Sequence, residues 1–291
     1  MKPAGFDYHR AESIENACEL LSVYGDDAKV LAGGQSLIPM MNFRLARPQV
    51  LIDISNIGNR NRVDDEADGV RVLATSTQRF VEQSKSVRER LPVLLEAIKH
   101  IAHFQIRNKG TIGGSIVNAD PASELPAMSL VLDAEYEIKS KGKQRTIPAE
   151  DFFITYMTTS LEPDEILSSI LFKAPPKKSG WGFHEMARRS GDFALAGSTA
   201  VIGLDSNGKC SHARISLFGV SPTPVRAKEA ETMLLGQVYS PELMRETAQQ
   251  VQEVVDPESD VHVTAEYRRS VAEVLARRAL EDAFHRASAA N

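Results

Sequence analysis

Two glycine pairs, Gly33-Gly34 and Gly113-Gly114, constrain this chain more than any other feature of its sequence. The first pair follows a strand expected at residues 29–32, and the second lies in a glycine-interrupted strand expected over residues 110–117. Glycine lets the backbone approach a bulky anion, because no Cβ blocks the approach and a positive φ costs little. One such pair is usually an ordinary turn or bulge, but two together favour a pyrophosphate site.

The residues around both pairs are small or polar and can add side-chain donors to such a site. The two segments are Ala32-Gly33-Gly34-Gln35-Ser36 and Thr111-Ile112-Gly113-Gly114-Ser115. Neither matches GxGxxG or GxxxxGK[ST], which disfavours a Rossmann dinucleotide site and a P-loop. The residues alone therefore indicate a pyrophosphate cradle of another kind.

Helix and strand signals alternate through the first part of the chain. The segment 13–24 predicts a short helix, with Ser13 as N-cap and Gly25 as its stop, and a strand is expected at residues 50–54. Residues 173–180, KAPPKKSG, read as a linker. Beyond it, antiparallel strands are expected up to residue 220, with a hairpin turn at Asn207-Gly208. The C-terminal segment reads as helical.

The last helix is expected to bury one apolar face and to expose its arginines. The apolar face comprises Tyr267, Val271, Val274 and Leu275, and the opposite face carries Arg268, Arg269, Arg277 and Arg278. Such arginines usually form a solvated face, although they can also meet an acidic patch on a partner subunit. The pattern as a whole predicts an α+β chain with three parts, residues 1–55, 56–176 and 177–291.

Composition narrows the classes of function. The 291 residues carry a net charge of -5, which gives no overall basic field for nucleic acid. Cys18 and Cys210 lie far apart, so they form no local ligand set for zinc or an iron–sulfur cluster. No apolar run is long enough to span a membrane, and the first residues lack the pattern of a secretory signal, so we expect a cytoplasmic protein.

Four segments of the sequence resemble the medium, FAD-binding subunit of the carbon monoxide dehydrogenase and xanthine dehydrogenase family. They are VLAGGQSLIPMMNFRLARP (30–48), IRNKGTIGGSIVNADPASELPA (106–127), LEPDEILSSI (161–170) and SDVHVTAEYRRSVAEVLARRAL (259–280). The resemblance runs nearly end to end. It implies two α/β FAD-binding subdomains followed by a C-terminal domain of a small antiparallel sheet plus a helix bundle.

The resemblance also implies which residues hold FAD. Residues 32–36 and 111–115 would wrap the diphosphate, Glu124 would lie near the ribityl chain, and Ile101 and Leu167 would contact the flavin or the adenine. His184 stands where some relatives carry a lysine near the flavin. Phe193 stands where some place a tyrosine over the isoalloxazine. Without the family context, His184 reads equally as a partly exposed strand residue and Phe193 as a core residue.

Other pairs of titratable residues allow alternative chemistry. Asp120 and Glu124 can be read as an acid–base pair, although Asp120-Pro121 is a common turn and helix start, which favours a structural role for Asp120. His100 and His103 have metal-ligand spacing, but no third ligand is near in the sequence, and histidines at helix ends are commoner. We therefore expect no catalytic side chain and no metal site on this chain.

The resemblance implies an electron-transfer subunit of a molybdopterin-dependent hydroxylase. Electrons would come from a molybdopterin cofactor on a large subunit, pass through [2Fe–2S] clusters on a small subunit, and leave this chain for an external acceptor. The expected assembly is a dimer of heterotrimers, a heterohexamer. The alternatives are a free-standing flavin-binding protein and a self-contained flavin oxidoreductase, and the latter would need its own substrate pocket with a proton donor.

Overall fold

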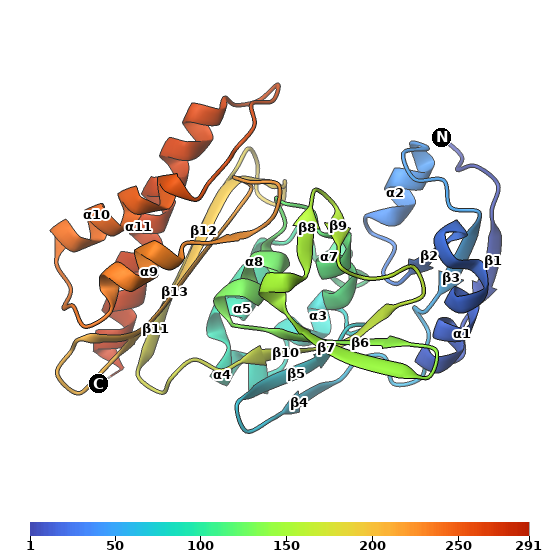
Figure 1. Cartoon of the computed structure of the whole chain (residues 1–291), viewed down its shortest axis with the longest axis horizontal. Coiled ribbons are helices and arrows are strands. Elements are labelled where there is room, and N and C mark those ends of the chain that lie inside the picture. Colours follow the sequence, from blue (N-terminus) through green and yellow to red (C-terminus); the bar gives the residue numbers. More distant parts are fainter. Residues whose placement is uncertain (291) are drawn as a thin grey trace.

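The computed structural model describes residues 1–290. Its N-terminal part contains a three-stranded parallel sheet in the order β1-β3-β2 (Figure 1). Helix α1 starts where predicted, because the Ser13 hydroxyl accepts a hydrogen bond from the backbone N–H of Asn16 at 3.0 Å, and it ends at Gly25. The elements are β1 (Asp7–Arg10), α1 (Ile14–Tyr24), β2 (Ala28–Leu31), α2 (Leu37–Asn42) and β3 (Val50–Asp53).

The middle part contains a five-stranded antiparallel sheet in the order β4-β5-β10-β6-β7 and a small hairpin, β8-β9. Its strands are β4 (Val63–Asp65), β5 (Gly69–Leu73), β6 (Glu135–Ser140), β7 (Lys143–Pro148), β8 (Phe153–Thr155), β9 (Thr158–Thr159) and β10 (Ile166–Lys173). The helices between β5 and β6 are α3 (Gln78–Glu82), α4 (Lys85–Arg90), α5 (Pro92–His100), α6 (Phe104–Arg107), α7 (Ile112–Asn118) and α8 (Glu124–Val131). Most of the buried apolar side chains of this part lie between the sheet and these helices.

The strand expected over residues 110–117 is wrong, because residues 112–118 form helix α7. The Thr111 hydroxyl caps this helix by accepting the backbone N–H of Gly114 at 3.0 Å, and Ala119 ends it in the left-handed conformation. Glycines and β-branched residues disfavour a helix on propensity alone. Tertiary packing explains the glycine, since a Cβ on Gly113 would lie 2.4 Å from the Cβ of Ala74.

The C-terminal part is a four-stranded antiparallel sheet, β11-β12-β13-β14, followed by three helices. The predicted turn at Asn207-Gly208 joins β12 to β13, and the Asp205 carboxylate accepts the backbone N–H of Asn207 at 2.8 Å. The elements are β11 (Ser179–Ala187), β12 (Ala194–Leu204), β13 (Cys210–Phe218), β14 (Val225–Arg226), α9 (Lys228–Leu234), α10 (Pro241–Gln250) and α11 (Ala265–Ala289).

The C-terminal sheet is covered on both faces, and Figure 1 shows it between α11 on one side and α5 and α8 on the other. Every residue of β12 is buried as a result. On the α11 side the contact is made by small residues: a Cβ on Gly182 would lie 2.0 Å from the backbone oxygen of Ala279. The other face joins the core of the middle part through Phe183, Val201 and Phe218.

The face that α11 buries is an alanine stripe, so the expected apolar face is partly wrong. Tyr267 and Val274 are exposed, whereas the fully buried residues include Ala272, Ala276, Ala279, Ala283 and Ala287. Small residues are needed here because the helix lies directly on the glycines of β11. No helix within residues 1–290 combines the length and hydropathy required to cross a bilayer.

The arginines near the start of α11 bind within the chain instead of forming a solvated face. The Arg268 guanidinium donates to the backbone oxygens of Leu195 and Gly219, at 2.7 and 2.9 Å. Arg269 donates to the backbone oxygens of Gln252 and Val255. These bonds tie the helix to β12 and to loops around the sheet, and only Arg278 of the four is exposed.

The close contact at Gly182 gives a first prediction. Gly182→Ala should lower the free energy of unfolding by about 1–3 kcal/mol, because the new methyl group must push α11 away from β11. The midpoint of urea unfolding measures the change. Gly5→Ala is the matched control, since a Cβ at Gly5 would meet nothing within 4 Å, and equal midpoints for the two variants would contradict the packing argument.

Candidate functional site

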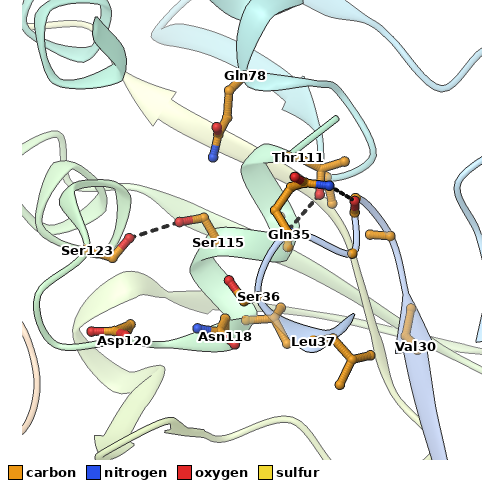
Figure 2. Close-up of a pocket in the computed structure, with 18 of the residues that line it drawn as sticks. Val30, Gln35, Ser36, Leu37, Gln78, Thr111, Ser115, Asn118, Asp120 and Ser123 are labelled. Carbon is orange, nitrogen blue, oxygen red and sulfur yellow. Dashed lines mark hydrogen bonds between the residues drawn. The ribbon is translucent and has the colours of Figure 1, made fainter. Parts of the chain in front are cut away.

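A cavity of about 490 Å³ opens where the loop after β2 meets the starts of α7 and α8 (Figure 2). Its volume lies within the range of roughly 300–1,000 Å³ that is typical of small-molecule and cofactor sites. Thirteen of the fourteen predicted site residues line it. They are Ala32, Gly33, Gly34, Gln35, Ser36, Ile101, Thr111, Gly113, Gly114, Ser115, Glu124, Leu167 and Phe193.

The two glycine segments, 80 residues apart in the sequence, touch each other in the fold. A Cβ on Gly33 would lie 2.3 Å from the backbone oxygen of Lys109 and 2.8 Å from the Cα of Gly110. Any side chain at Gly33 would therefore force the two loops apart. At this position the glycine makes room for another part of the protein, whereas the sequence alone suggested room for an anion.

The loop after β2 offers several free backbone donors to the cavity. Within residues 1–290, the backbone N–H groups of residues 33–36 donate no hydrogen bond. Gly34 has a φ of 71°, a conformation that side chains rarely adopt. The Gln35 amide donates to the backbone oxygen of Gly33 at 2.8 Å and so braces the turn. Consecutive free N–H groups in a turn form a concave site for an anion.

The second glycine segment contributes differently. The backbone N–H groups of Ile112 and Gly113 donate to Ser76 and Ala74 at 2.9 Å, and that of Gly114 is used by the Thr111 cap. These donors hold α7 against β5 and the residues that follow it, so they are not free for a ligand. The second pair therefore shapes the cavity wall, and the first pair supplies the free donors.

Gln78, at the start of α3, is a site residue that the sequence did not reveal. Figure 2 shows its amide pointing into the cavity, and its Oε1 atom is buried without a hydrogen-bond partner among residues 1–290. A buried polar atom without a partner is rare in a native fold and costs about 1–3 kcal/mol. Gln78 therefore fits an acceptor for a polar group of a bound ligand. Only the fold brings it beside residues 33–36.

Ser115 and Ser123 place a second polar group in the cavity. Their hydroxyl oxygens lie 3.0 Å apart, as Figure 2 shows, and Ser123 precedes α8. Asp120 accepts the backbone N–H of Ala122 at 3.0 Å, which agrees with the structural role favoured for it. Its carboxyl also lines the cavity, and burial raises its pKa.

Glu124 is the most strongly perturbed carboxyl of the site. It is the first residue of α8 and only 5% exposed. Burial, followed by the nearby charge of Glu185, raises the pKa of Glu124 to about 8. A carboxyl in this state is largely protonated at neutral pH, so it can donate a hydrogen bond to a ligand.

Apolar side chains form the rest of the lining. Ile101, at the end of α5, and Leu167, on β10, are both buried. Phe193 is 61% exposed and lies beside Gly191 in the loop between β11 and β12. The cavity therefore combines donors and acceptors with apolar walls, which is the mixture that a flat aromatic ring system joined to a phosphate requires.

His184 is the one predicted site residue that the fold does not bring to the cavity. Successive side chains of a strand point to opposite faces, and the glycines at 180 and 182 show that even positions of β11 face α11. His184 accordingly lies 3.2 Å from the Asp282 carboxylate of α11. Its neighbours Phe183 and Glu185 face the middle part instead.

The paired histidines at 100 and 103 do not come together with further ligands. His100 packs against the Phe183 ring, with centroids 4.9 Å apart, and its Nδ1 lies 3.9 Å from Glu185 Oε2. Within residues 1–290, no three His, Cys, Asp or Glu side chains are arranged as a metal site. Cys18 and Cys210 are buried and unpaired, as packing residues are.

Two family models together match most of the chain. The FAD binding domain in molybdopterin dehydrogenase matches residues 4–173, and the CO dehydrogenase flavoprotein C-terminal domain matches residues 181–283. The chain belongs to this family. It is a medium, FAD-binding subunit of the molybdenum hydroxylases, and hence an oxidoreductase component.

Relatives of known activity are similar to this subunit over nearly their whole length. The 6-hydroxypseudooxynicotine dehydrogenase complex subunit alpha of Paenarthrobacter nicotinovorans is 39% identical over 99% of this chain and 97% of its own. The carbon monoxide dehydrogenase medium chain of Hydrogenophaga pseudoflava is 38% identical over 98% of this chain and 99% of its own. These relatives support the subunit interpretation over a self-contained flavin oxidoreductase.

Solved structures agree with the α+β fold that was predicted. Carbon monoxide dehydrogenase from Hydrogenophaga pseudoflava superposes with a TM-score of 0.95, covering 98% of this chain and 99% of that one at 38% identity. Quinoline 2-oxidoreductase from Pseudomonas putida 86 superposes with a TM-score of 0.92 at 32% identity, covering 99% of both chains. The medium-subunit architecture is thus confirmed for this chain.

The raised pKa of Glu124 predicts a pH-dependent stability of the flavin-free subunit. A carboxyl whose folded pKa lies near 8, above an unfolded value near 4.5, stabilises the fold most below pH 4.5 and loses that contribution as the pH rises through 8. Glu124→Gln should remove this loss, so at pH 8.5 the variant should be more stable than the wild type, by on the order of 2 kcal/mol.

Urea unfolding at pH 5 and pH 8.5 measures the difference. Glu89→Gln is the control, because the Glu89 side chain is 62% exposed and pairs with Lys85 on the surface of α4. If the free energy of unfolding depends on pH in the same way in the wild type and in Glu124→Gln, the prediction is wrong, because ionising the Glu124 carboxyl would then cost the folded state little free energy.

Proposed function

We propose that this subunit binds FAD in the cavity and carries electrons between its partners and an external acceptor. The electrons come from a molybdenum centre on a large subunit by way of [2Fe–2S] clusters on a small subunit. When bound, FAD supplies the redox chemistry. The chain itself supplies position, donors and acceptors for the cofactor, and walls that limit the access of water.

The observation that carries the FAD proposal is the set of free backbone donors at residues 33–36. In the part of the chain that the structure describes, the four consecutive N–H groups of residues 33–36 have no partner, and all four residues line the cavity. A diphosphate carries the negative charge and the oxygen acceptors that such a loop lacks. A neutral ligand of similar size would leave most of these donors unpaired, which is costly in a partly buried site.

The resemblance to the family suggests a role for most of the remaining site residues, and Gln78 is added from the fold. The segment 111–115 closes the cradle behind the diphosphate, and the protonated Glu124 carboxyl bonds a ribityl hydroxyl. Ile101 and Leu167 contact the planar rings, and Phe193 shields a ring face at the edge of the cavity. Gln78 accepts a hydrogen bond from the cofactor through its unpaired Oε1. His184 is left out, because it binds Asp282.

We further propose that the chain divides into domains at residues 1–55, 56–176 and 177–291. Each of these ranges holds one of the three main sheets, which supports the division. The FAD cavity then lies mainly between the first two domains, with Phe193 reaching in from the third. The sheet of the third domain packs against α5 and α8. The ends of these two helices contribute Ile101 and Glu124 to the cavity.

We place the subunit in a cytoplasmic heterohexamer, a dimer of heterotrimers. Purification of a tagged chain from its native host should recover two partners, a large molybdopterin chain and a short iron–sulfur chain. Metal analysis should find molybdenum and iron, and native mass measurement should give two copies of each chain. If the chain elutes alone and carries FAD, the proposed assembly is wrong, whereas the proposed FAD site is supported.

The free donors also give a prediction at Gly34. Gly34→Val should abolish FAD retention, because a β-branched residue cannot hold the φ of 71° that aims the loop at the cavity. The absorbance of the purified chain in the flavin band measures occupancy. Gly142→Val is a matched control, since Gly142 has the same φ of 71° but lies in open space at the β6-β7 turn.

Both variants carry a similar backbone strain, of about 1–3 kcal/mol. Only Gly34→Val should lose the flavin. Full occupancy in Gly34→Val, or an equal loss in both variants, would remove the assignment of residues 33–36 to the diphosphate.

A further inference from the structure

A second cavity, of about 450 Å³, lies on the outer face of the five-stranded sheet, and the proposed function assigns nothing to it. Successive residues of β5 point to opposite faces of this sheet. Val70 and Val72 join the core beneath the helices, whereas Arg71 and Leu73 line the second cavity. Figure 1 shows α3, α5, α7 and α8 on one side of the sheet. The second cavity therefore lies on the side away from these helices.

The two cavities share one wall, which is made by the residues at the end of β5 and the start of β10. Ala74 lines the FAD cavity, while its neighbours Leu73 and Thr75 line the second cavity. In the same way Leu167 lines the FAD cavity and Ser168 lines the second one. The backbone N–H of Ala74 donates to the backbone oxygen of Ser168 at 2.9 Å, so the wall is continuous.

The lining of the second cavity carries an excess of positive charge. Its four cationic and three acidic side chains are Arg60, Arg62, Arg71, Lys139, Asp64, Glu66 and Glu137. Arg62 pairs with Asp64 at 2.7 Å, and Arg71 pairs with Glu66. These two pairs neutralise each other, so the charge that remains in the lining is positive.

Arg60 and Lys139 are the cations that remain to bind a ligand. The Arg60 guanidinium donates to the backbone oxygen of Ser55 at 2.8 Å, and among residues 1–290 it pairs with no carboxylate. The Lys139 ammonium lies 3.7 Å from the carboxylate of Glu15, whose side chain is 72% exposed, which makes a weak surface pair. Guanidinium and ammonium groups bind phosphate and carboxylate oxygens through charge-assisted hydrogen bonds.

The rest of the lining suits the carbon skeleton and the hydroxyl groups of such an anion. Ile14 and Ile57 add apolar surface beside Leu73. The Glu137 carboxylate accepts the Ser168 hydroxyl at 2.8 Å, and a carboxylate can accept more than one hydrogen bond. The volume is that of a site for a small molecule. The cavity therefore fits a small organic anion that also carries a hydroxyl group.

The loop that carries Arg60 is bonded to residues that hold the start of α7. The Thr75 hydroxyl donates to the backbone oxygen of Arg60 at 2.7 Å, and the Ser76 hydroxyl accepts the backbone N–H of Arg62 at 3.0 Å. The backbone oxygen of Ser76 accepts the N–H of Ile112 at 2.9 Å. Ser76 thus connects the loop 59–62 directly to the second glycine segment of the FAD cavity.

We propose that the second cavity binds a small hydroxylated organic anion, whose carboxylate or phosphate contacts Arg60 and Lys139, and that this binding strengthens the binding of FAD. The anion site stands on the second cavity alone, whereas the link to FAD rests on the proposed function. An anion fixes the loop 59–62 and, through Ser76, orders the start of α7 before the cofactor binds. By linkage, FAD strengthens the binding of the anion by the same factor.

The test titrates the full-length chain, with and without FAD, by calorimetry at constant ionic strength. The probes are phosphoglycerate, which carries a phosphate, a carboxylate and a hydroxyl, and malate, which carries carboxylates and a hydroxyl. Glycerol, which carries only hydroxyls, is the neutral control. Phosphoglycerate or malate should bind the flavin-free chain with a Kd below about 1 mM, and glycerol should not bind. The tighter of the two anions distinguishes a phosphate ligand from a carboxylate ligand.

Arg60→Gln and Lys139→Gln should each weaken the binding of the anion by about tenfold, because each removes a charge-assisted hydrogen bond. Arg88→Gln is the matched control, since Arg88 is exposed on α4 and does not line the cavity. It should bind the anion as the wild type does. Failure of both anions to bind the wild type, or wild-type affinity in both cavity variants, would overturn the proposal.

A second titration tests the link between the two cavities. FAD is added to the flavin-free chain with and without a saturating amount of the anion, and the change in flavin fluorescence gives its Kd. The anion should lower the Kd of FAD by about fivefold. An unchanged Kd would overturn the link. If the chain binds the anion but no FAD, the anion site is supported and the proposed function is contradicted.

Methyl resonances of the wild type keep the proposal testable if the variants do not fold. Ile14 and Ile57 line the second cavity, whereas Ile215 is buried in the core of the C-terminal part. Addition of phosphoglycerate or malate to the chain labelled at isoleucine methyl groups should shift the resonances of Ile14 and Ile57 and leave that of Ile215 in place. Unshifted resonances of Ile14 and Ile57 would show that neither anion enters the cavity.

Discussion

The contact between Gly33 and the backbone of Lys109 and Gly110 is the constraint on which the rest of this subunit depends. It joins the loop after β2, from the parallel sheet, to the loop before α7, from the antiparallel sheet. A single methyl group at Gly33 would lie 2.3 Å from a backbone oxygen and would separate the two loops. This contact brings together the two loops that line the cavity.

The second requirement is the close packing of the C-terminal sheet between α11 and the helices α5 and α8. Glycines at 180 and 182 let the alanine face of α11 lie directly on β11. Because the even-numbered side chains of β11 face α11, the odd-numbered ones face the middle part, and Glu185 lies beside His100. Packing far from the cavity thus determines the electrostatics next to Glu124.

The sequence predicted the strongly periodic elements well and the glycine-rich ones poorly. Helix α1 was predicted from Ser13 and Gly25, because a cap and an apolar stripe are local signals. Helix α7 was mistaken for a strand, since its two glycines and β-branched residues disfavour a helix. The glycine is needed for a tertiary contact, the fit of Gly113 against Ala74, a partner 39 positions earlier in the chain, while the Thr111 hydroxyl caps the helix.

The sequence by itself determined the family, the α+β fold and thirteen of the residues that line the cavity, because motif residues keep their identity and spacing wherever the chain folds. Only the tertiary structure decided which backbone groups remain free to bind a ligand and which side chains point into the cavity. It gave the free donors to residues 33–36, brought in Gln78, and turned His184 away while turning Glu185 inward. The physical reason is that burial, strand facing and hydrogen-bond satisfaction are properties of contacts between distant segments, which no local pattern records.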